Sequence, residues 1–420
     1  MKKLLLLPLI AISFISTAQT TAIPDANFEQ ELINYGYDNV IDGGVLTANI
    51  SGVTSLNVNN SSIADLTGIE DFTALDTLNC ADNSLTNLDV SQNTALTYLN
   101  CSSAGTNNIT SLDVSQNTAL QTLECSYNQL TSLDVTQNTA LTWLNCEYNQ
   151  LTSLDVSQNT ALTDLDCGGN QLTSLDVSQN TALIDLFCYN NQLINLDVSQ
   201  NTALTELACA DNNLTSLDVT GAHALIIILC FNNQLTSIDV TQNTALEDLW
   251  CHNNQLTTLD VAQNTALTWL NCQSNYLFCL NVKNGNNSNI SWWAFDASSN
   301  PNLTCIEVDD VAYSDANWSN IDPQTTFSAN CNNSCLPTSI NETALNTFEL
   351  YPNPTTSTIT LNNLQLGDEV SVYNTLGERV YSSQVNAVTL SIKLSELGNN
   401  GIYFVRVNDI SERVLLISGH

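Results

Sequence analysis

The chain has 420 residues, of which 43% are hydrophobic, and its 42 acidic and 7 basic residues give a formal net charge of −35. The hydrophobic content is that of an ordinary folded protein and the acidic residues are dispersed, so extensive disorder is not expected. The strong negative charge repels phosphate backbones and anionic lipid headgroups, which argues against nucleic acid and bare membrane as partners.

Residues 1–18 have the pattern of a secretory signal peptide. Lys2 and Lys3 precede the apolar run "LLLLPLIAISFI", and small residues follow at Ser16, Thr17 and Ala18. Such segments are removed during export. A residue other than Cys would follow the cleavage, so no lipoprotein anchor is expected. No later apolar run approaches the roughly 20 residues that cross a bilayer, so we expect no transmembrane segment.

Residues 19–52 are predicted to form an N-terminal cap with a short helix. In "IPDANFEQELINYGYD", Asp25 is a helix N-cap candidate, and Phe28, Leu32 and Ile33 follow at helical spacing. A cap is needed because the first unit of a repeat protein has no preceding neighbour to cover its apolar face.

Residues 53–276 repeat a pattern L-x-x-L-x-C-x-x-N-x-L-x-x-L-D-V. Its cysteines recur every 21 residues, except for one interval of 24, at Cys80, Cys101, Cys125, Cys146, Cys167, Cys188, Cys209, Cys230, Cys251 and Cys272. A fixed period of this length is typical of a leucine-rich repeat solenoid. Alternate side chains of L-x-C point inward, which predicts a parallel β-sheet on the concave face and a mostly irregular convex side.

Each repeated polar or sulfur column has an expected structural role. We expect the asparagine two residues before each "L-x-x-L-D-V" to bond the backbone of its own and adjacent turns. The ten cysteines are expected to be free thiols, because parallel strands lie about 4.8 Å apart, whereas disulfide Cβ atoms lie roughly 3.5–4.5 Å apart.

The aspartates of the "LDV" segments form another column, for which two interpretations stay open. Each carboxylate can accept bonds from backbone N–H groups or Ser/Thr hydroxyls of the adjoining turn. Calcium bridging is the alternative, since this ion favours clustered carboxylate oxygens, although no dedicated calcium loop is present. No other cofactor is expected.

Residues 277–336 keep the apolar spacing with longer loops, as a C-terminal cap would. Cys279, Cys305, Cys331 and Cys335 lie outside the ladder, and we expect one or two disulfides here, with Cys279 to Cys305 the favoured pair. The tryptophans of this segment are expected in the core of the cap, at Trp292, Trp293 and Trp318.

The composition changes at residues 337–347, which are predicted to be a polar linker. Residues 348–420 then show alternating apolar residues between Gly and Asn turns, which predicts a small antiparallel β-sandwich. The motifs "YPNP", "VYNTLGERV" and "LSELGNNGIYFVRV" resemble the C-terminal sorting domain of the type IX secretion system of Bacteroidetes. The resemblance implies the type IX secretion machinery as a partner, passage through the periplasm, and a final location that is secreted or on the outer cell surface.

The tight consensus L-x-C-x-x-N-x-L-T-x-L-D-V-S-x-N resembles the cysteine-ladder leucine-rich repeats of the internalin J type. These are bacterial surface adhesins, so the resemblance implies ligand binding at a surface. One repeat departs from the consensus, where Gly221 and Ala222 replace "QN" and Ile228 replaces a Leu, and we expect a local irregularity of the convex wall there.

The repeats vary mainly at the outward positions beside each L-x-C, where aromatic and acidic residues gather. Apolar patches rimmed by polar groups mark interaction sites, and aromatic residues are common at their centres. The candidate ligand-binding residues on the concave face are Trp143, Tyr148, Asp164, Asp166, Asp185, Phe187, Tyr189, Glu206, Phe231, Asp248, Trp250, His252 and Trp269.

The sequence leaves the class of ligand open. Trp143, Trp250 and Trp269 would be platforms for a carbohydrate, whereas aromatic and acidic residues together would meet a basic patch of a protein. The alternative is a structural surface or matrix component without a discrete ligand, whose variable positions drift neutrally. An enzyme is not expected, because no catalytic constellation is found and an open face should leave both Asp164 and Asp166 solvated and ionised.

Overall fold

The computed structural model describes residues 19–331 and, in the C-terminal part, residues 349–351, 355, 357–362, 364, 366–374, 378–396, 401–407 and 410–416. The chain divides into two compact units, 1–336 and 337–420, and each is described by itself. The predicted signal peptide, the predicted linker and Cys335 lie outside the described residues. Among the described residues, no helix is long and apolar enough to cross a membrane.

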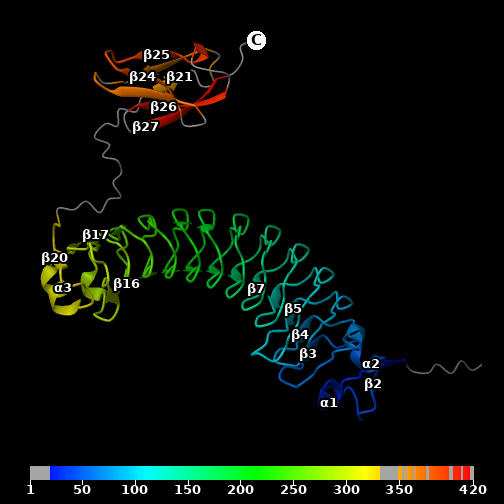
Figure 1. The fold of residues 1–420 in the computed structure, drawn as a ribbon. Coiled ribbons are helices and arrows are strands. Elements are labelled where there is room, and N and C mark those ends of the chain that lie inside the picture. Colours follow the sequence, from blue (N-terminus) through cyan, green and yellow to red (C-terminus); the bar gives the residue numbers. More distant parts are fainter. Residues whose placement is uncertain are drawn as a thin grey trace, which may run out of the picture. The chain divides into compact units, whose positions relative to one another are not determined.

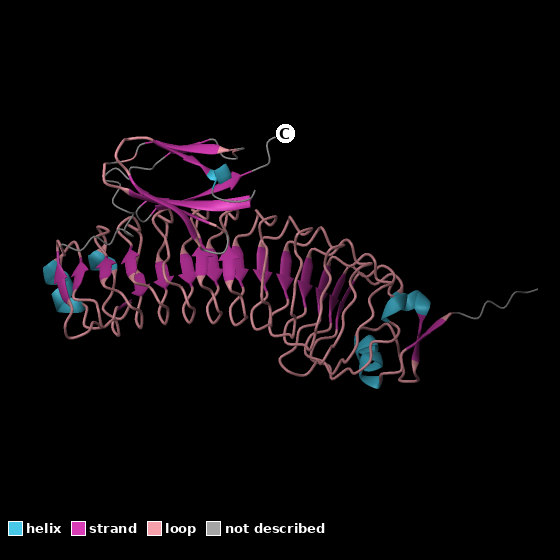
Figure 2. Cartoon of the chain, turned by 45° about the horizontal axis from the view of Figure 1, so that its top comes forward, coloured by secondary structure: helices cyan, strands magenta, loops and turns pink. Residues whose placement is uncertain are grey.

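The first unit is a leucine-rich repeat solenoid that forms an arc, with one short strand per turn lying side by side with the next (Figures 1 and 2). These strands make a 12-stranded parallel sheet along the concave side. Its members are β3 (Ser55–Asn57), β4 (Thr77–Asn79), β5 (Tyr98–Asn100), β6 (Thr122–Glu124), β7 (Trp143–Asn145), β8 (Asp164–Asp166), β9 (Asp185–Phe187), β11 (Glu206–Ala208), β13 (Ile227–Leu229), β14 (Asp248–Trp250), β16 (Trp269–Asn271) and β18 (Phe295–Asp296).

Each three-residue strand of this sheet has a buried middle residue between two outward ones. In β8, for example, Leu165 is buried, and it pairs in register with Leu144 of β7 and Leu186 of β9. The 21-residue period therefore places equivalent residues of successive turns next to one another. Apolar side chains fill the interior, and the outward positions form continuous lines on the surface.

The ten ladder cysteines are buried and free, as the strand spacing predicts. Burial raises the pKa of the thiols of Cys101, Cys188 and Cys230 to about 12. They therefore remain protonated and act as small apolar side chains.

The predicted asparagine ladder is confirmed. Asn170 Nδ2 donates to the carbonyls of Cys146, Cys167 and Gly168 at 3.0, 3.1 and 3.1 Å, and its Oδ1 accepts the N–H of Leu151 at 3.0 Å. One buried amide thus satisfies backbone groups of two turns, which no regular secondary structure supplies at this point.

A second asparagine ladder, which sequence reasoning missed, runs along the "QN" segments. Asn159 Nδ2 donates to the carbonyls of Val135 and Asn138 in the preceding turn, both at 2.9 Å. The equivalent residues are Asn93, Asn117, Asn138, Asn180, Asn201, Asn243 and Asn264. The signal was the unchanging Asn of "QNTAL" in the sequence.

Ala222 interrupts this second ladder. There, a Cβ on the neighbouring Gly221 would lie 1.8 Å from the carbonyl oxygen of Ser199, so only glycine fits. The departure from the consensus therefore changes the packing between two turns, as expected.

A second row of strands lies in "LDV" segments and in the C-terminal cap, in two parallel groups. The first group is β10 (Asn195–Asp197) and β12 (Ser216–Asp218), and the second is β15 (Thr258–Asp260), β17 (Cys279–Asn281), β19 (Cys305–Glu307) and β20 (Thr326–Ser328).

The aspartate column is held by bonds from backbone N–H groups and Thr hydroxyls, as the first interpretation predicts, but the donors lie two residues later in the same segment and not in the adjoining turn. Asp155 Oδ1 accepts the N–H of Ser157 at 2.9 Å, and this bond lowers the pKa of the carboxyl group. The same contact to the N–H two residues later recurs at Asp89, Asp113, Asp134, Asp176, Asp197, Asp218, Asp239 and Asp260. Among the residues that the structure describes, no group of three or more His, Cys, Asp or Glu is placed to hold a metal ion.

The N-terminal cap combines an antiparallel pair, β1 (Thr20–Ala22) and β2 (Gly44–Leu46), with α1 (Ala26–Asn34) and α2 (Thr47–Ile50). A 3₁₀ turn, η1 (Ile69–Asp71), follows in the first repeat. Asp25 is the N-cap of α1, and its second carboxylate oxygen accepts the N–H groups of Ala64 and Asp65 at 2.7 and 3.0 Å. Phe28 and Leu32 are buried, while Ile33 is half-buried. One side chain therefore starts the helix and joins it to the first turn.

The C-terminal cap contains η2 (Asn287–Asn289) and α3 (Val311–Asn317). Trp318 is buried and stacks on Phe295, with ring centroids 4.1 Å apart. The prediction is wrong for Trp292 and Trp293, which are 63% and 55% exposed. Their place in the chain did not distinguish the core of the cap from its surface.

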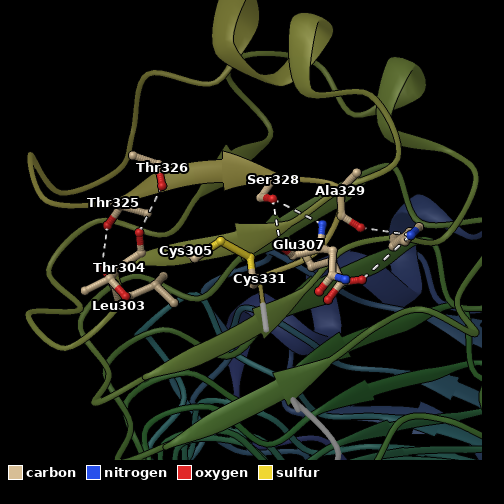
Figure 3. Close-up of a disulfide and its surroundings, with 11 residues drawn as sticks. Leu303, Thr304, Cys305, Glu307, Thr325, Thr326, Ser328, Ala329 and Cys331 are labelled. Atoms are coloured by element: carbon tan, nitrogen blue, oxygen red, sulfur yellow. Dashed lines mark hydrogen bonds and ion pairs between the residues drawn. A yellow bond between two sulfur atoms is a disulfide. The ribbon is translucent and has the colours of Figure 1, made fainter. Parts of the chain in front are cut away.

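The predicted pairing of Cys279 with Cys305 is also wrong. Cys305 is bonded to Cys331, with Cα atoms 5.7 Å apart (Figure 3). Cys279 and Cys305 precede the paired residues Leu280 and Ile306 on neighbouring parallel strands. This is the arrangement that keeps the ladder cysteines unbonded. Cys279 takes part in a different disulfide.

The second unit contains two small antiparallel sheets and η3 (Leu394–Glu396), consistent with the predicted antiparallel fold. Ile359, Leu361, Val370 and Val372 belong to one core shared by both sheets. The sheets are β21 (Glu349–Tyr351), β22 (Thr358–Asn362) and β25 (Leu390–Lys393), and β23 (Glu369–Tyr373), β24 (Arg379–Gln384), β26 (Gly401–Val407) and β27 (Ile410–Leu416).

Replacing a ladder amide should strongly destabilise the solenoid. We expect Asn170→Ala to lower the free energy of unfolding by about 3 kcal/mol, because buried carbonyl and N–H groups lose their partners. Urea titration followed by circular dichroism measures this change. The neighbouring exposed Gln171→Ala should alter the value little, and equal losses in the two variants would contradict the role of the ladder.

Calcium should contribute little to the stability of the aspartate column. We expect the melting temperature of the protein to be the same with excess chelator and with added calcium, because backbone N–H groups already bond these carboxylates. Differential scanning calorimetry tests this, and a rise in melting temperature with added calcium would support calcium bridging instead.

Candidate ligand-binding surface

We define the concave face as the outward side of the 12-stranded sheet together with the residues that follow each ladder cysteine. Strand register brings the predicted site residues onto this face in three lines. The first line contains Trp143, Asp164, Asp185, Glu206, Asp248 and Trp269, the second Asp166, Phe187 and Trp250, and the third, after the strands, Tyr189, Phe231 and His252. Tyr148 lies one residue further on, in the turn.

The aromatic residues of this face are less exposed than their outward positions predict. Trp143 is 43% and Tyr148 38% exposed, whereas the other five predicted aromatic residues are half-buried. Most of them are covered by rings from neighbouring turns, so the face consists of packed clusters with accessible edges.

One group, which we call the tyrosine cluster, contains Tyr127, Tyr148 and Tyr189. Tyr127 and Tyr148 stack with their ring centroids 4.5 Å apart, and Tyr148 meets Tyr189 edge-on at 6.3 Å. Two glycines provide the room, since a Cβ on Gly168 would lie 2.6 Å from the Tyr189 ring and a Cβ on Gly169 would lie 2.6 Å from the Tyr148 ring. The glycine pair in this repeat therefore lets two large rings lie against the backbone.

Two carboxylates accompany the tyrosine cluster. Tyr189 Oη donates to Glu147 Oε2 at 2.6 Å, which spans two turns, and Asp166 Oδ1 accepts the N–H of Gly168 at 3.0 Å. Burial raises the pKa of Asp166 to about 7, the Gly168 N–H lowers it, and the nearby negative charge of Glu147 raises it further. The expectation that Asp164 and Asp166 are both solvated and ionised is therefore wrong for Asp166, which is half-buried.

The backbone beneath the tyrosine cluster has a left-handed conformation, with φ of 54° at Tyr127 and 49° at Tyr148. Non-glycine residues adopt this region uncommonly, and Asn and Asp tolerate it best. Equivalent turns place Gly169, Asn190 and Asp211 there. A tyrosine in this conformation costs more conformational energy than Gly, Asn or Asp, and the other turns show that the turn forms without tyrosine.

A second group, the tryptophan cluster, lies at the C-terminal end of the concave face and contains Phe231, Trp250, His252, Trp269 and Trp293. Trp250 and Trp269 stack at 5.0 Å, Phe231 and His252 stack at 4.6 Å, and Trp293 meets Trp269 edge-on at 4.7 Å. Sequence reasoning missed Trp293. The signal was "WWAFD", whose last two residues form β18 beside β16.

An acidic row begins beside the tyrosine cluster and continues toward the tryptophan cluster, made of Asp164, Asp185 and Glu206 on adjacent strands. Burial and then the neighbouring carboxylates raise the pKa of Asp185 and of Glu206, although a bond from Thr205 lowers that of Asp185. Residues 19–331 contain one Lys or Arg, Lys283, which pairs with Glu307 in the C-terminal cap. The negative charge of the concave face therefore has no basic side chain within the solenoid to balance it.

The fold and the sequence pattern together define a leucine-rich repeat protein with a C-terminal secretion sorting domain. Residues 349–415 match the family of secretion system C-terminal sorting domains, which confirms the predicted type IX sorting domain.

The repeats are similar to those of internalin J from Listeria monocytogenes serotype 4b. A stretch of 71 residues is 42% identical to that protein and covers 17% of this chain and 8% of internalin J, so the chain spans a small part of this relative by sequence. The solved functional domain of internalin J, which includes a cysteine ladder, is 28% identical with a TM-score of 0.52, and the match covers 97% of this chain and all of the solved one.

A leucine-rich repeat protein of Leptospira interrogans shares the fold. It is 24% identical with a TM-score of 0.53, and the match covers 67% of this chain and 73% of the other. At this identity the likeness concerns the fold alone.

Removing the carboxyl group of Asp166 should stabilise the protein at alkaline pH. Its pKa is raised on folding from 3.8 to about 7, so the folded state holds the proton more tightly and the free energy of unfolding falls as pH rises between these values. We expect Asp166→Asn to melt a few degrees above the unchanged protein at pH 8 and close to it at pH 4. A difference that is equal at both pH values would contradict this account.

Proposed function

We propose that this chain is a secreted or surface-attached adhesin that binds a protein or carbohydrate ligand on the concave face of its solenoid. The observation that carries the proposal is the combination, on adjacent strands in register, of accessible aromatic edges and uncompensated carboxylates. The solenoid needs neither at these positions, since its stability comes from the inward leucines and the asparagine ladders.

The sorting domain supports secretion or an outer-surface location. We propose that the route runs through the periplasm to the type IX machinery, with the predicted signal peptide directing the first step. Under this proposal the second unit serves export and the solenoid serves binding, which agrees with their separate cores.

A structural surface component is the second candidate. It is favoured by the mutual stacking of Trp250 and Trp269, which cover part of each other without any ligand. Trp143 discriminates between the two functions, because it is exposed and no ring contact covers it among the described residues.

A single substitution tests the binding function. We expect Trp143→Ala to weaken binding of the full chain to its ligand about tenfold, as for an aromatic residue at an interface, while changing the melting temperature little. Binding is measured on a glycan array and by capture of proteins from cell surfaces, with captured ligands titrated individually.

The matched control is Thr160→Ala, an exposed substitution in the loop of the next turn, away from the sheet. Equal affinities of Trp143→Ala and Thr160→Ala for the ligand would mean that the ligand does not bind at Trp143 on the concave face. The absence of any ligand in both assays would favour the structural role.

A further inference from the structure

We propose that the tyrosine cluster, together with Glu147 and Asp166, is a recognition site for a cationic side chain, Lys or Arg, of a protein partner. The inference rests on the proposed binding function of the concave face and deepens it, since it selects a protein with a basic contact residue as the ligand.

The rings provide surfaces suited to a cation. Tyr127, Tyr148 and Tyr189 come from three different turns, and one pair is stacked while the other is edge-on. An ammonium or guanidinium group over the face of such a ring is attracted by its quadrupole, and guanidinium groups also stack on it. Tyr127 and Tyr148 remain 44% and 38% exposed, so the cluster is accessible from solvent.

The carboxylates have unused acceptor capacity. Within the described residues, the side chain of Glu147 accepts one hydrogen bond, from Tyr189, and that of Asp166 accepts one, from Gly168. An ionised carboxylate can accept about four. No basic side chain forms an ion pair with either of them in the described part of the chain, so a ligand can supply the missing donors and the missing charge.

Asp166 is not needed for the turn in which it lies. At the same position other turns carry an asparagine whose Oδ1 bonds the N–H two residues later at 2.9–3.2 Å, namely Asn79, Asn100, Asn145 and Asn271. An amide therefore makes the same bond without a charge. A half-buried carboxylate without a cationic partner costs stability, and a bound cation offsets this cost.

The surrounding charge favours a basic protein surface over a neutral ligand. Asp164 lies on the same strand as Asp166, and Asp185 and Glu206 continue the acidic row on the next two strands. With strands about 4.8 Å apart, the row extends roughly 10 Å, which matches several contact residues on a partner. Negative potential of this kind steers a positively charged partner to the site.

Binding of oligolysine and oligoarginine peptides to the full chain, measured by isothermal titration calorimetry at physiological salt, tests the proposal. We expect Asp166→Asn and Glu147→Gln each to raise Kd about tenfold. Tyr148→Asn should do the same without changing the net charge. Each variant is expected to fold, since equivalent turns use Asn at the positions of Asp166 and Tyr148, and Gln273 occupies the position of Glu147. Asp166→Asn should itself be the more stable protein.

Asp176→Asn is the matched control, because it removes one charge from an exposed carboxylate in the "LDV" column, which is outside the concave sheet, and keeps the local hydrogen bond possible. Its Kd should equal that of the unchanged protein. An equal weakening by Asp176→Asn and Asp166→Asn would mean general charge attraction and would overturn the proposal, as would full-strength binding by Tyr148→Asn.

The experiments distinguish a failure of the cationic contact from a failure of the proposed binding function. If Trp143→Ala loses the natural ligand while the tyrosine-cluster variants bind both that ligand and the basic peptides normally, the concave face is the binding surface but the cationic contact is wrong. A natural ligand that proves to be a neutral glycan would also overturn the proposal.

Discussion

The structure depends on one constraint, which is that every turn must satisfy its backbone polar groups against the next turn. Strands of two or three residues supply few hydrogen bonds, and the regular backbone bonds of the loops, such as Gln171 N–H to the Leu151 carbonyl, leave further buried carbonyls to be satisfied. Two columns of buried asparagine amides fill this need, each amide reaching carbonyls of the preceding turn. The period of the repeat is the spacing at which these amides, the leucines and the cysteines recur in register.

This arrangement separates stability from recognition. The inward leucines, the ladder cysteines and both asparagine columns form the repeated buried interior, whereas the outward strand positions and the residues after each cysteine lie outside it and carry different side chains in different turns. These positions can therefore differ between turns without changing the fold. The tyrosine cluster illustrates the freedom, because it combines a glycine pair, left-handed tyrosines and a half-buried carboxylate within one regular solenoid.

Predictions from sequence were correct where they depended only on the regular contact between one turn and the next. The free cysteines, the first asparagine ladder and the bonded aspartate column all follow from strand spacing and from the demand for satisfied backbone groups. The predicted disulfide between Cys279 and Cys305 was wrong because the two residues lie at the same position of neighbouring parallel strands. The strand spacing that keeps the ladder cysteines unbonded therefore applies to them as well. Cys331 reaches Cys305 from outside the repeat, where no period applies.

By itself the sequence determined the solenoid, its register, the composition of the concave face and the presence of a sorting domain, because periodicity and family motifs are properties of the chain. The tertiary structure decided which rings cover one another, that Trp293 joins Trp269, and that Tyr189 lies over Gly168 to reach Glu147. It also decided that Asp166 is half-buried. These features arise from contacts between side chains of different turns. The rotamers and the burial of these side chains depend on neighbouring residues, which the repeat pattern of the sequence does not specify.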